Sequence, residues 1–354
     1  MSERSQRVGI LLILVLGTVL RFGGLDWGIR DLEGYELDGK AVSINDAGFN
    51  ADADALHRAA ESLNERYYPF VEYAGQPYLF TSYGTVFLYL HRIAASFGSW
   101  FGDYEAFGSH AADANPTRLA GRWASALAGV ALIWVTWLVG RIIVGSEGAL
   151  LGALLVAVMP MSVQAAHLAT VDGLLGLWYA LALYASVMVV ERAEVRDYVL
   201  AGVAIGLAVA TKINGLFLFL PLCLAHLLRE AQPISMAGIR RAASSRTIYG
   251  AAGTAVLTWI VLTPAALFQW ESYFFPEFAG PYHVSFSLRK ASEAASAHRG
   301  WLHLEGASTY FHHPLHVFPN GMGWVVQVAL LAGIVASFVK RSPKLMVVAV
   351  SFLV

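Results

Sequence analysis

Two aspartates lie two residues apart in a polar stretch that comes before most of the long apolar segments of the chain. Asp52 and Asp54 belong to FNADADALHRAAESLN, residues 49–64, where apolar residues recur at helical spacing. The start of a helix favours negative charge, so these aspartates remain ionised. An ionised carboxylate within reach of a hydroxyl or an amide can act as a general base. Both residues could instead serve only as helix caps.

A second set of polar residues interrupts the apolar part of the chain. His167 and Asp172 lie at the start of a long apolar segment, and Lys212 and Asn214 break another at AVATKINGL. A charged side chain at membrane depth is costly unless it faces water, a cavity or an opposite charge. We therefore predict that this set forms a binding site, with Lys212 facing an anion. His167 could bind a phosphate or a sugar, or could be a satisfied polar group at a helix end.

Arginines supply further positive charge. Arg118 and Arg122 open an apolar segment one helical turn apart, so they share a face. The planar guanidinium group suits phosphate, which makes both residues, and more weakly Arg58, candidates for phosphate binding. Arg118 and Arg122 could instead only extend their charges to the membrane interface.

A metal or nucleotide site is not expected. The segment 269–320 contains His312, His313 and His316, but Pro314 keeps them off a regular helix face and no thiolate lies near them. The aromatic residues of this segment are typical of sugar stacking or of a bilayer interface. The chain has no P-loop and no dinucleotide-binding fingerprint. We therefore predict no metal, no cofactor and no soluble nucleotide donor.

The composition indicates a membrane protein. Apolar residues make up 57% of the chain and charged residues 14%, and the mean hydropathy is +0.55. Soluble domains average about 25% charged residues. The net charge of -1 gives no footprint for nucleic acid. The single cysteine, Cys223, excludes an internal disulfide.

Apolar runs of about 20 residues predict several membrane spans. The candidate spans are 8–25, 118–140, 148–166, 173–190, 248–268, 322–339 and 345–354. The last run is incomplete at Val354, so we expect a chain that is truncated at its C-terminus. We treat residues 1–354 as one domain.

Two segments, 83–100 and 198–228, decide the topology. Arginine and lysine collect on the inner side if 83–100 lies flat on the outer surface and 198–228 is a pair of short helices. The alternative is that 83–100 is an ordinary span. The preferred topology makes 26–117 and 269–320 large outer loops and brings the polar candidates together on the outer face. We therefore predict a multi-pass protein of the plasma membrane with an outer-face site.

At these residues the chain resembles the GT-C membrane glycosyltransferases. The resemblance is nearest to the dolichyl-phosphate-mannose-protein mannosyltransferase group and its bacterial relatives, including the aminoarabinose transferases of lipid A. It rests on the order and spacing of several stretches: RFGGLDWG at 21–28, FNADAD at 49–54, TSYGTVFLYL at 81–90, RLAGRWASALAG at 118–129, GRIIVGSEGALLGALLVAVMP at 140–160, HLATVDGLLGLWYALALY at 167–184, YVLAGVAIGLAVATKINGL at 198–216 and GMGW at 321–324.

The resemblance implies a fold, a donor and an activity. The fold would be an all-α polytopic bundle with large outer loops that carry juxtamembrane helices. A sugar would pass, with inversion, from a polyprenyl or dolichyl phosphate to a protein, lipid or glycan acceptor. The family's acidic pair falls on Asp52 and Ala53, so the second acid is absent or displaced to Asp54. Arg118, Asp172 and Lys212 match the family's arginine, second-loop aspartate and lysine.

Two other functions fit part of the pattern. Short helices in 198–228 are also found in transporters and lipid flippases. Ala53 in place of an acid would suit a relative that binds a lipid-linked sugar without catalysis.

Overall fold

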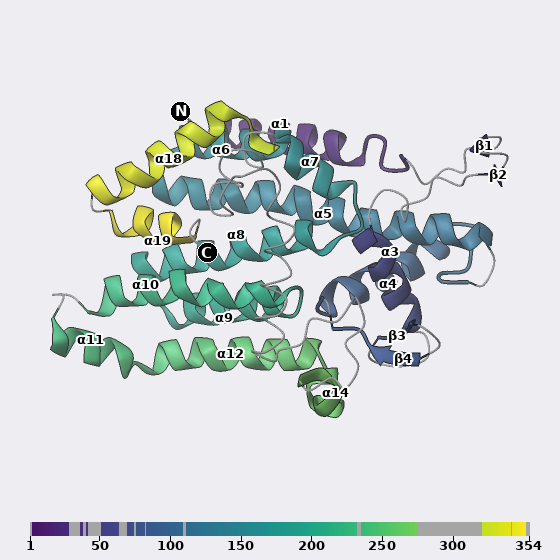
Figure 1. Ribbon diagram of the computed structural model, residues 1–354. Helices are drawn as coiled ribbons and strands as arrows, with labels where there is room; N and C mark the ends of the chain where they lie inside the picture. The colour runs from purple at the N-terminus through teal and green to yellow at the C-terminus, as the bar shows by residue number, and fades with distance from the viewer. Residues whose placement is uncertain are drawn as a thin grey trace, which may run out of the picture.

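The computed structural model describes residues 2–27, 36–37, 40–41, 51–63, 69–73, 76–81, 83–108, 111–231, 235–274, 321–340 and 342–351. Within these ranges the chain is a bundle of long helices with a smaller group of elements at one end (Figure 1). The all-α polytopic fold predicted from the sequence is confirmed. Most of the predicted loop 269–320, with His312, His313 and His316, lies outside the described residues.

The bundle contains the following helices: α1 (Glu3–Phe22), α5 (Ala111–Ile143), α6 (Gly145–Val158), α7 (Pro160–Ala166), α8 (Val171–Glu191), α9 (Val195–Val209), η1 (Ile213–Leu218), α10 (Phe219–Glu230), α11 (Met236–Ala243), α12 (Arg246–Leu262), α13 (Ala265–Phe268), α14 (Trp270–Phe274), α18 (Trp324–Val339) and α19 (Pro343–Ser351). The smaller group contains α3 (Ala51–Ser62), α4 (Val86–Ser99) and two antiparallel hairpins, β1–β2 (Glu36–Leu37 and Lys40–Ala41) and β3–β4 (Phe70–Tyr73 and Gln76–Leu79).

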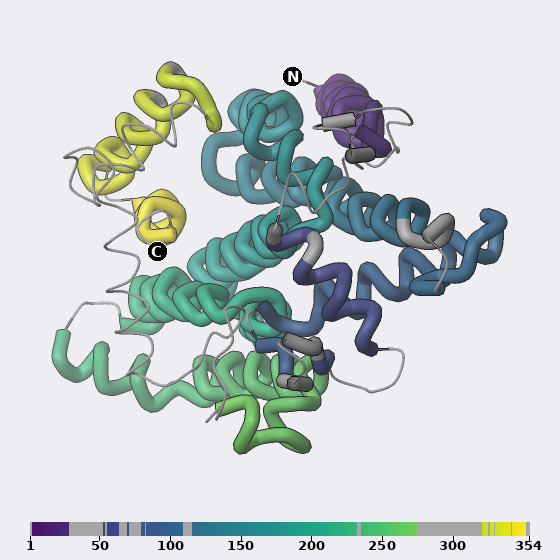
Figure 2. The backbone as a smooth tube through the Cα atoms, turned by 45° about the vertical axis from the view of Figure 1, so that its right-hand side comes forward, coloured from purple at the N-terminus to yellow at the C-terminus, as the bar shows by residue number. Residues whose placement is uncertain are grey.

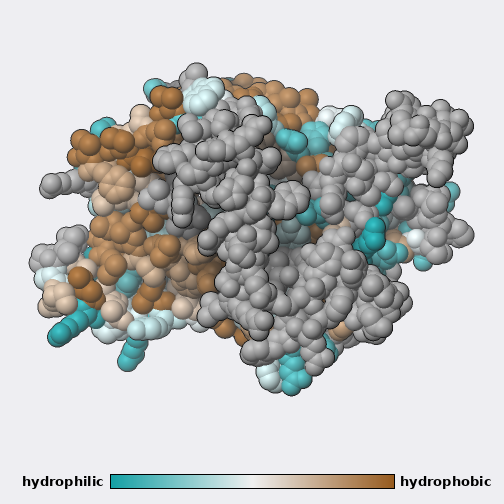
Figure 3. All heavy atoms as spheres, in the orientation of Figure 1, coloured by the Kyte–Doolittle hydropathy of each residue, from teal (hydrophilic) through white to brown (hydrophobic). Residues whose placement is uncertain are grey.

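Four helical stretches of the described chain are long and apolar enough to cross a membrane. They are Glu3–Phe22, Asn115–Ile143, Val171–Glu191 and Ile213–Glu230, and the bent pair α6–α7 makes a fifth if it counts as one span. Figure 3 shows hydrophobic residues gathered over the long helices. These features agree with a multi-pass membrane protein.

The order of packing places α8 at the centre of the bundle. This helix packs against α5 on one side and against α9 and α10 on the other, and α12 covers α9. At one side of the bundle, α19 packs against α8 and α10, and α18 packs against α19 (Figure 2). The burial of alanine and valine on α8 and α9 follows from this position, since both helices have neighbours on several faces.

Proline divides two of the predicted spans. The predicted span 148–166 is bent by 57° where α6 ends and Pro160 begins α7. The predicted span 248–268 ends as a regular helix at Leu262, and α13 follows Pro264. Proline lacks the N–H group that continues a helix, but its fixed φ suits the first turn of a new one.

The structure gives the form of the two segments on which the predicted topology depends. Segment 198–228 forms two helices, α9 and the continuous η1–α10, with a break at 210–212. Helix α4 has 14 residues, which gives a length of about 21 Å, against the roughly 30 Å of a bilayer core. Its buried face packs against α5 and α3.

Arg21 ties α1 to the bend between α6 and α7. Its guanidinium group is fully buried and donates to the carbonyl oxygens of Gly17, Val156 and Ala157 at 2.9–3.2 Å and to the Ser162 hydroxyl at 2.8 Å. Two of these carbonyls belong to the last turn of α6, where the intrahelical partners are missing. The arginine therefore satisfies the acceptors that the bend leaves open.

Replacement of Arg21 by leucine is expected to destabilise the fold. Each buried acceptor that loses its donor costs about 1–3 kcal/mol, and several lose it at once. The melting temperature of the purified protein in detergent should fall clearly. Arg7→Leu is the matched control, because the Arg7 side chain on the same helix is 81% exposed. Equal melting temperatures for the two variants would contradict the role of Arg21.

Candidate active site

Four polar residues from distant parts of the sequence meet at one end of the bundle. The Lys212 ammonium lies 3.1 Å from the Asp172 carboxylate and 5.5 Å from the centre of the Tyr83 ring. The Tyr83 hydroxyl is hydrogen-bonded to the Asp52 side chain. Figure 1 shows α3, α4, the start of α8 and the α9–α10 connection at this same end. We call Asp52, Tyr83, Asp172 and Lys212 the polar cluster.

Lys212 is presented by the break between α9 and η1. The break is held by a hydrogen bond of 3.1 Å from the Trp178 indole N–H to the Thr211 hydroxyl. It also needs Gly215, where a Cβ atom would lie 2.4 Å from the carbonyl carbon of Ala208. Lys212 itself is in an extended conformation, with φ -156° and ψ 134°. Lys212 therefore lies outside the regular helix that ends at Val209, and its side chain is 30% exposed.

Tyr83 is fixed by backbone pairing with the same break. The amides of Gly84 and Val86 donate to the carbonyls of Thr211 and Ala210 at 3.0 and 3.2 Å. Thr85 donates to the carbonyl of Leu262 at the end of α12. The segment 83–86 therefore docks on the break and holds the Tyr83 ring next to Lys212.

Asp172 stands in the first turn of α8, after Thr170 at the N-cap position. Backbone N–H groups at a helix start favour a carboxylate there. The Asp172 side chain is 55% exposed, so its ion pair with Lys212 is only partly shielded from water. An exposed pair of this kind contributes about 0–1 kcal/mol. A stronger anion could therefore take Lys212 away from Asp172 at low cost.

Helix α3 carries Asp52 near its start, where the residue is exposed. Asp54 lies in the same helix, but its side chain is outside the described part of the structure. Leu56, Ala59 and Ala60 are fully buried and fix α3 in place. The helical start predicted from the sequence is therefore present for both aspartates.

His57 connects α3 to the arginines. Its ring stacks on Phe107 at 5.5 Å and lies 5.6 Å from His91. Burial lowers the pKa of His57 to about 3, and the charges of His91, Arg118 and Arg58 add to this effect. The imidazole is therefore neutral at physiological pH. Arg58, the next residue in α3, is exposed, and Arg118 in α5 is partly buried.

Arg122 and His167 are placed in a different group. The buried Arg122 donates to the carbonyls of Leu25 and Trp27 at 2.9 and 2.5 Å, just after α1. The two ring nitrogens of His167 lie 2.9 Å from the carbonyl of Val163 and 3.1 Å from that of Gly23. These contacts join the end of α1 to α5 and α7.

A cavity of about 460 Å³ adjoins this second group, and it is lined by Gly23, Gly24, Trp27, Gln164, His167 and Leu168. Asn214 has a backbone contact, since its carbonyl accepts a hydrogen bond of 3.0 Å from the Tyr179 hydroxyl.

Most of the other residues predicted from the sequence fall into three groups: the polar cluster, the arginines around His57 and the group at the end of α1.

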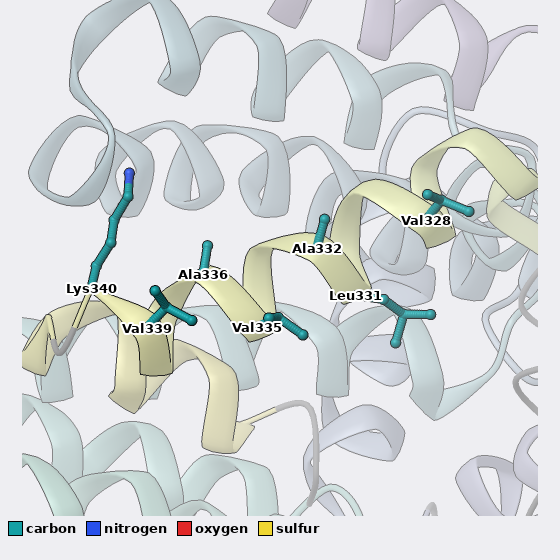
Figure 4. Close-up of a pocket in the computed structure, with 7 residues that line it drawn as sticks. All are labelled: Val328, Leu331, Ala332, Val335, Ala336, Val339 and Lys340. Carbon is teal, nitrogen blue, oxygen red and sulfur yellow. The ribbon is translucent and has the colours of Figure 1, made fainter.

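An apolar groove of about 520 Å³ runs along α18 (Figure 4). Its lining is aliphatic except for Lys340 at one end: Val328, Leu331, Ala332, Val335, Ala336, Val339 and Lys340. Such a lining suits a hydrocarbon chain and offers almost no hydrogen bond to a sugar.

The described residues contain no group of three or more His, Cys, Asp or Glu side chains that could hold a metal ion.

Tyr83 is the member of the polar cluster that the sequence interpretation missed. A tyrosine in the apolar run TSYGTVFLYL has the pattern of an interfacial residue. The only local signal is Gly84 beside it, because a Cβ atom there would lie 1.9 Å from the Ala210 carbonyl oxygen. Position 84 needs a glycine because two distant segments approach each other closely there. A single sequence does not show such an approach.

Comparisons with known proteins show a family match over part of the chain. The family model for dolichyl-phosphate-mannose-protein mannosyltransferases matches residues 114–265. This range contains Arg118, Asp172 and Lys212 and excludes Asp52 and Tyr83. A search of the curated proteins finds no match.

Solved membrane proteins share the fold. The protein O-mannosyltransferase complex Pmt1–Pmt2 of S. cerevisiae, bound to its sugar donor, is 18% identical with a TM-score of 0.55 over 78% of this chain and 36% of that one. ArnT of Cupriavidus metallidurans, bound to undecaprenyl phosphate, is 16% identical with a TM-score of 0.59 over 97% of this chain and 53% of that one. The chain thus spans between a third and about half of the length of these proteins. The resemblance to this superfamily is confirmed: the chain has the fold of the GT-C membrane glycosyltransferases and carries the mannosyltransferase family pattern over residues 114–265.

Proposed function

We propose that this protein transfers a sugar from a polyprenyl or dolichyl phosphate to an acceptor at the outer face of the membrane. The observation that carries the proposal is the polar cluster, in which a carboxylate and a lysine ammonium contact the same tyrosine at one end of an apolar bundle. The donors and lipids named with the two similar structures support a lipid-phosphate substrate.

In this proposal Asp52 is the general base. Its carboxylate takes the proton of the acceptor hydroxyl while the hydroxyl oxygen attacks the anomeric carbon. The bond from that carbon to the phosphate oxygen breaks, and its electron pair leaves with the polyprenyl phosphate. Because the nucleophile enters opposite the leaving group, the configuration inverts. Asp54 is the alternative base from the same helix start.

Lys212 binds the phosphate and stabilises the charge that develops on it. A fixed positive group lowers the activation barrier most when it faces the atom on which negative charge develops in the transition state. The phosphate would replace Asp172 as the partner of Lys212, and the weak exposed ion pair permits this exchange. Arg118 and Arg58, whose charges act on His57, are further cations for the phosphate or its sugar.

His167, Asn214 and Arg122 have secondary places in the proposal. His167 lines the cavity at the end of α1 and could contact an acceptor there. Asn214 stands two residues after Lys212, within η1, and its side chain could reach the donor. Arg122 supports the site through its contacts with the carbonyls after α1.

The outer-face assignment is supported by the distribution of arginine. Helix α8 begins at the polar cluster and ends next to Arg192, whose guanidinium pairs with Asp197 at 2.7 Å. Arg229 and Arg241 also lie at connections of this far end. Arginine-rich connections are typical of the cytoplasmic side. The polar cluster would then face outward, at the plasma membrane.

The direct test is release of free polyprenyl phosphate. The purified protein is incubated in vesicles with a panel of polyprenyl-phosphate sugars and a mixture of protein, lipid and glycan acceptors. We expect release from at least one donor, with the sugar recovered on an acceptor. Binding of polyprenyl phosphate without any release would overturn catalysis, and uptake into sealed vesicles without a covalent product would indicate a transporter.

Replacement of Lys212 by methionine is expected to raise the KM for the donor by about 10–100-fold, because a hydrogen bond to a charged group contributes about 1.5–3 kcal/mol. Lys344→Met is the matched control. Lys344 is also 30% exposed and also pairs with one carboxylate, Glu191, but it lies at the other end of α8. An equal KM for the two variants would exclude Lys212 from donor binding.

A further inference from the structure

We propose that Tyr83 is a positioning residue with two separable tasks: its hydroxyl orients the Asp52 carboxylate, and its ring holds the Lys212 ammonium in place for the donor phosphate. This inference rests on the function proposed above. It assigns one residue to both sides of the reaction, the acceptor side through Asp52 and the donor side through Lys212.

The hydroxyl side is supported by the state of the phenol. Burial, followed by the nearby charges of Asp52 and Asp172, raises the pKa of Tyr83 far above its usual value. Tyr83 therefore stays protonated and donates its hydrogen bond to Asp52. A carboxylate has two oxygens, so one can accept from Tyr83 while the other takes the proton of an acceptor. The hydrogen bond fixes the rotation of a carboxylate that is otherwise exposed.

The ring side is supported by the neighbours of Lys212. The ammonium faces the Tyr83 ring at 5.5 Å as well as the Asp172 carboxylate at 3.1 Å. A cation over an aromatic face gains about 0.5–2 kcal/mol, more when water is excluded. If a phosphate displaces Asp172, the ring remains as the neighbour that keeps the long lysine side chain in one position.

The backbone makes Tyr83 suitable for both tasks. The hydrogen bonds of Gly84 and Val86 join the tyrosine segment to Ala210 and Thr211, directly before Lys212 in the sequence. The ring of Tyr83 also lies 6.4 Å from that of Phe80. The backbone therefore holds Tyr83 next to Lys212, and Asp52 contacts Tyr83 through the hydroxyl.

Two variants separate the tasks in the donor-release assay. Tyr83→Phe keeps the ring and removes the hydroxyl, so kcat should fall by about 10-fold or more while the KM for the donor stays within about 2-fold. Tyr83→Leu removes both, so the same loss of kcat should come with a rise in KM of roughly 5-fold. Tyr104→Phe is the control, because its hydroxyl donates to the Ala95 carbonyl on α4, at 3.0 Å.

The outcomes are distinguishable. The inference is overturned if Tyr83→Phe keeps the wild-type kcat, or if the phenylalanine and leucine variants have the same KM for the donor. A purely structural role predicts a parallel loss of melting temperature and activity in both variants, and this result would also overturn it. If the wild-type protein releases no polyprenyl phosphate from any donor, the proposed function itself fails.

Discussion

Asp52→Asn is expected to lower the kcat of sugar transfer by about 10²–10⁴-fold, the usual contribution of a general base. Asparagine has the same size as aspartate, and its carbonyl oxygen can still accept the hydrogen bond from Tyr83. The amide cannot take up a proton from the acceptor, however. The melting temperature and the KM for the donor should therefore stay close to the wild-type values while turnover is lost.

The measurement is kcat at saturating donor, followed by released polyprenyl phosphate. Asp103→Asn removes the same charge from an exposed residue between α4 and α5 and should have no effect. Activity that survives Asp52→Asn and disappears only in the Asp52→Asn, Asp54→Asn double variant would move the base to Asp54. Full activity in the double variant would exclude this helix start from catalysis.

Gly84→Ala is expected to damage both stability and activity. The added Cβ atom would lie 1.9 Å from the carbonyl oxygen of Ala210, which is far inside contact distance. The segment 83–86 must therefore move away from the break after α9. Overpacking of this kind costs about 1–3 kcal/mol. The displacement also moves Tyr83 away from Lys212, and a misplacement of about 1 Å can reduce a rate by 100-fold.

The two effects are measured by the melting temperature in detergent and by kcat with the preferred donor. Gly250→Ala is the matched control, since a Cβ atom at this helical glycine meets no atom within 4 Å. If Gly84→Ala behaves like Gly250→Ala, the segment 83–86 does not dock closely on α9. The shared position of Tyr83 and Lys212 would then need another explanation.

The sequence predicts the features that follow from the free-energy cost of placing a given side chain in a membrane span. Long apolar runs identify the bundle because a membrane span requires them. Asp172 and Lys212 stand out because charge is expensive in such runs, and the structure places the two at 3.1 Å from each other. The break at TKING is visible for the same reason. Pro160 and Pro264 divide two of the predicted spans, and the apolar runs alone do not show this division.

The sequence does not predict contacts that join distant segments. Tyr83 meets Lys212 only because backbone amides of 83–86 pair with the end of α9. Arg122 has the spacing of a phosphate ligand on the face of Arg118, yet the chain after α1 supplies carbonyls for its guanidinium group. Periodicity shows which residues share a face, but it does not show what lies opposite that face.

The polar cluster is assembled from two separate stretches of the chain, and this division affects how such a protein can diversify. Lys212 and Asp172 belong to the stretch that matches the family model, whereas Asp52 and Tyr83 precede it. Under the proposed function, changes in the earlier stretch would alter the acceptor while the later stretch keeps the same lipid carrier. A lineage could thus acquire new acceptors by mutation or recombination upstream of residue 114 without rebuilding its use of the carrier.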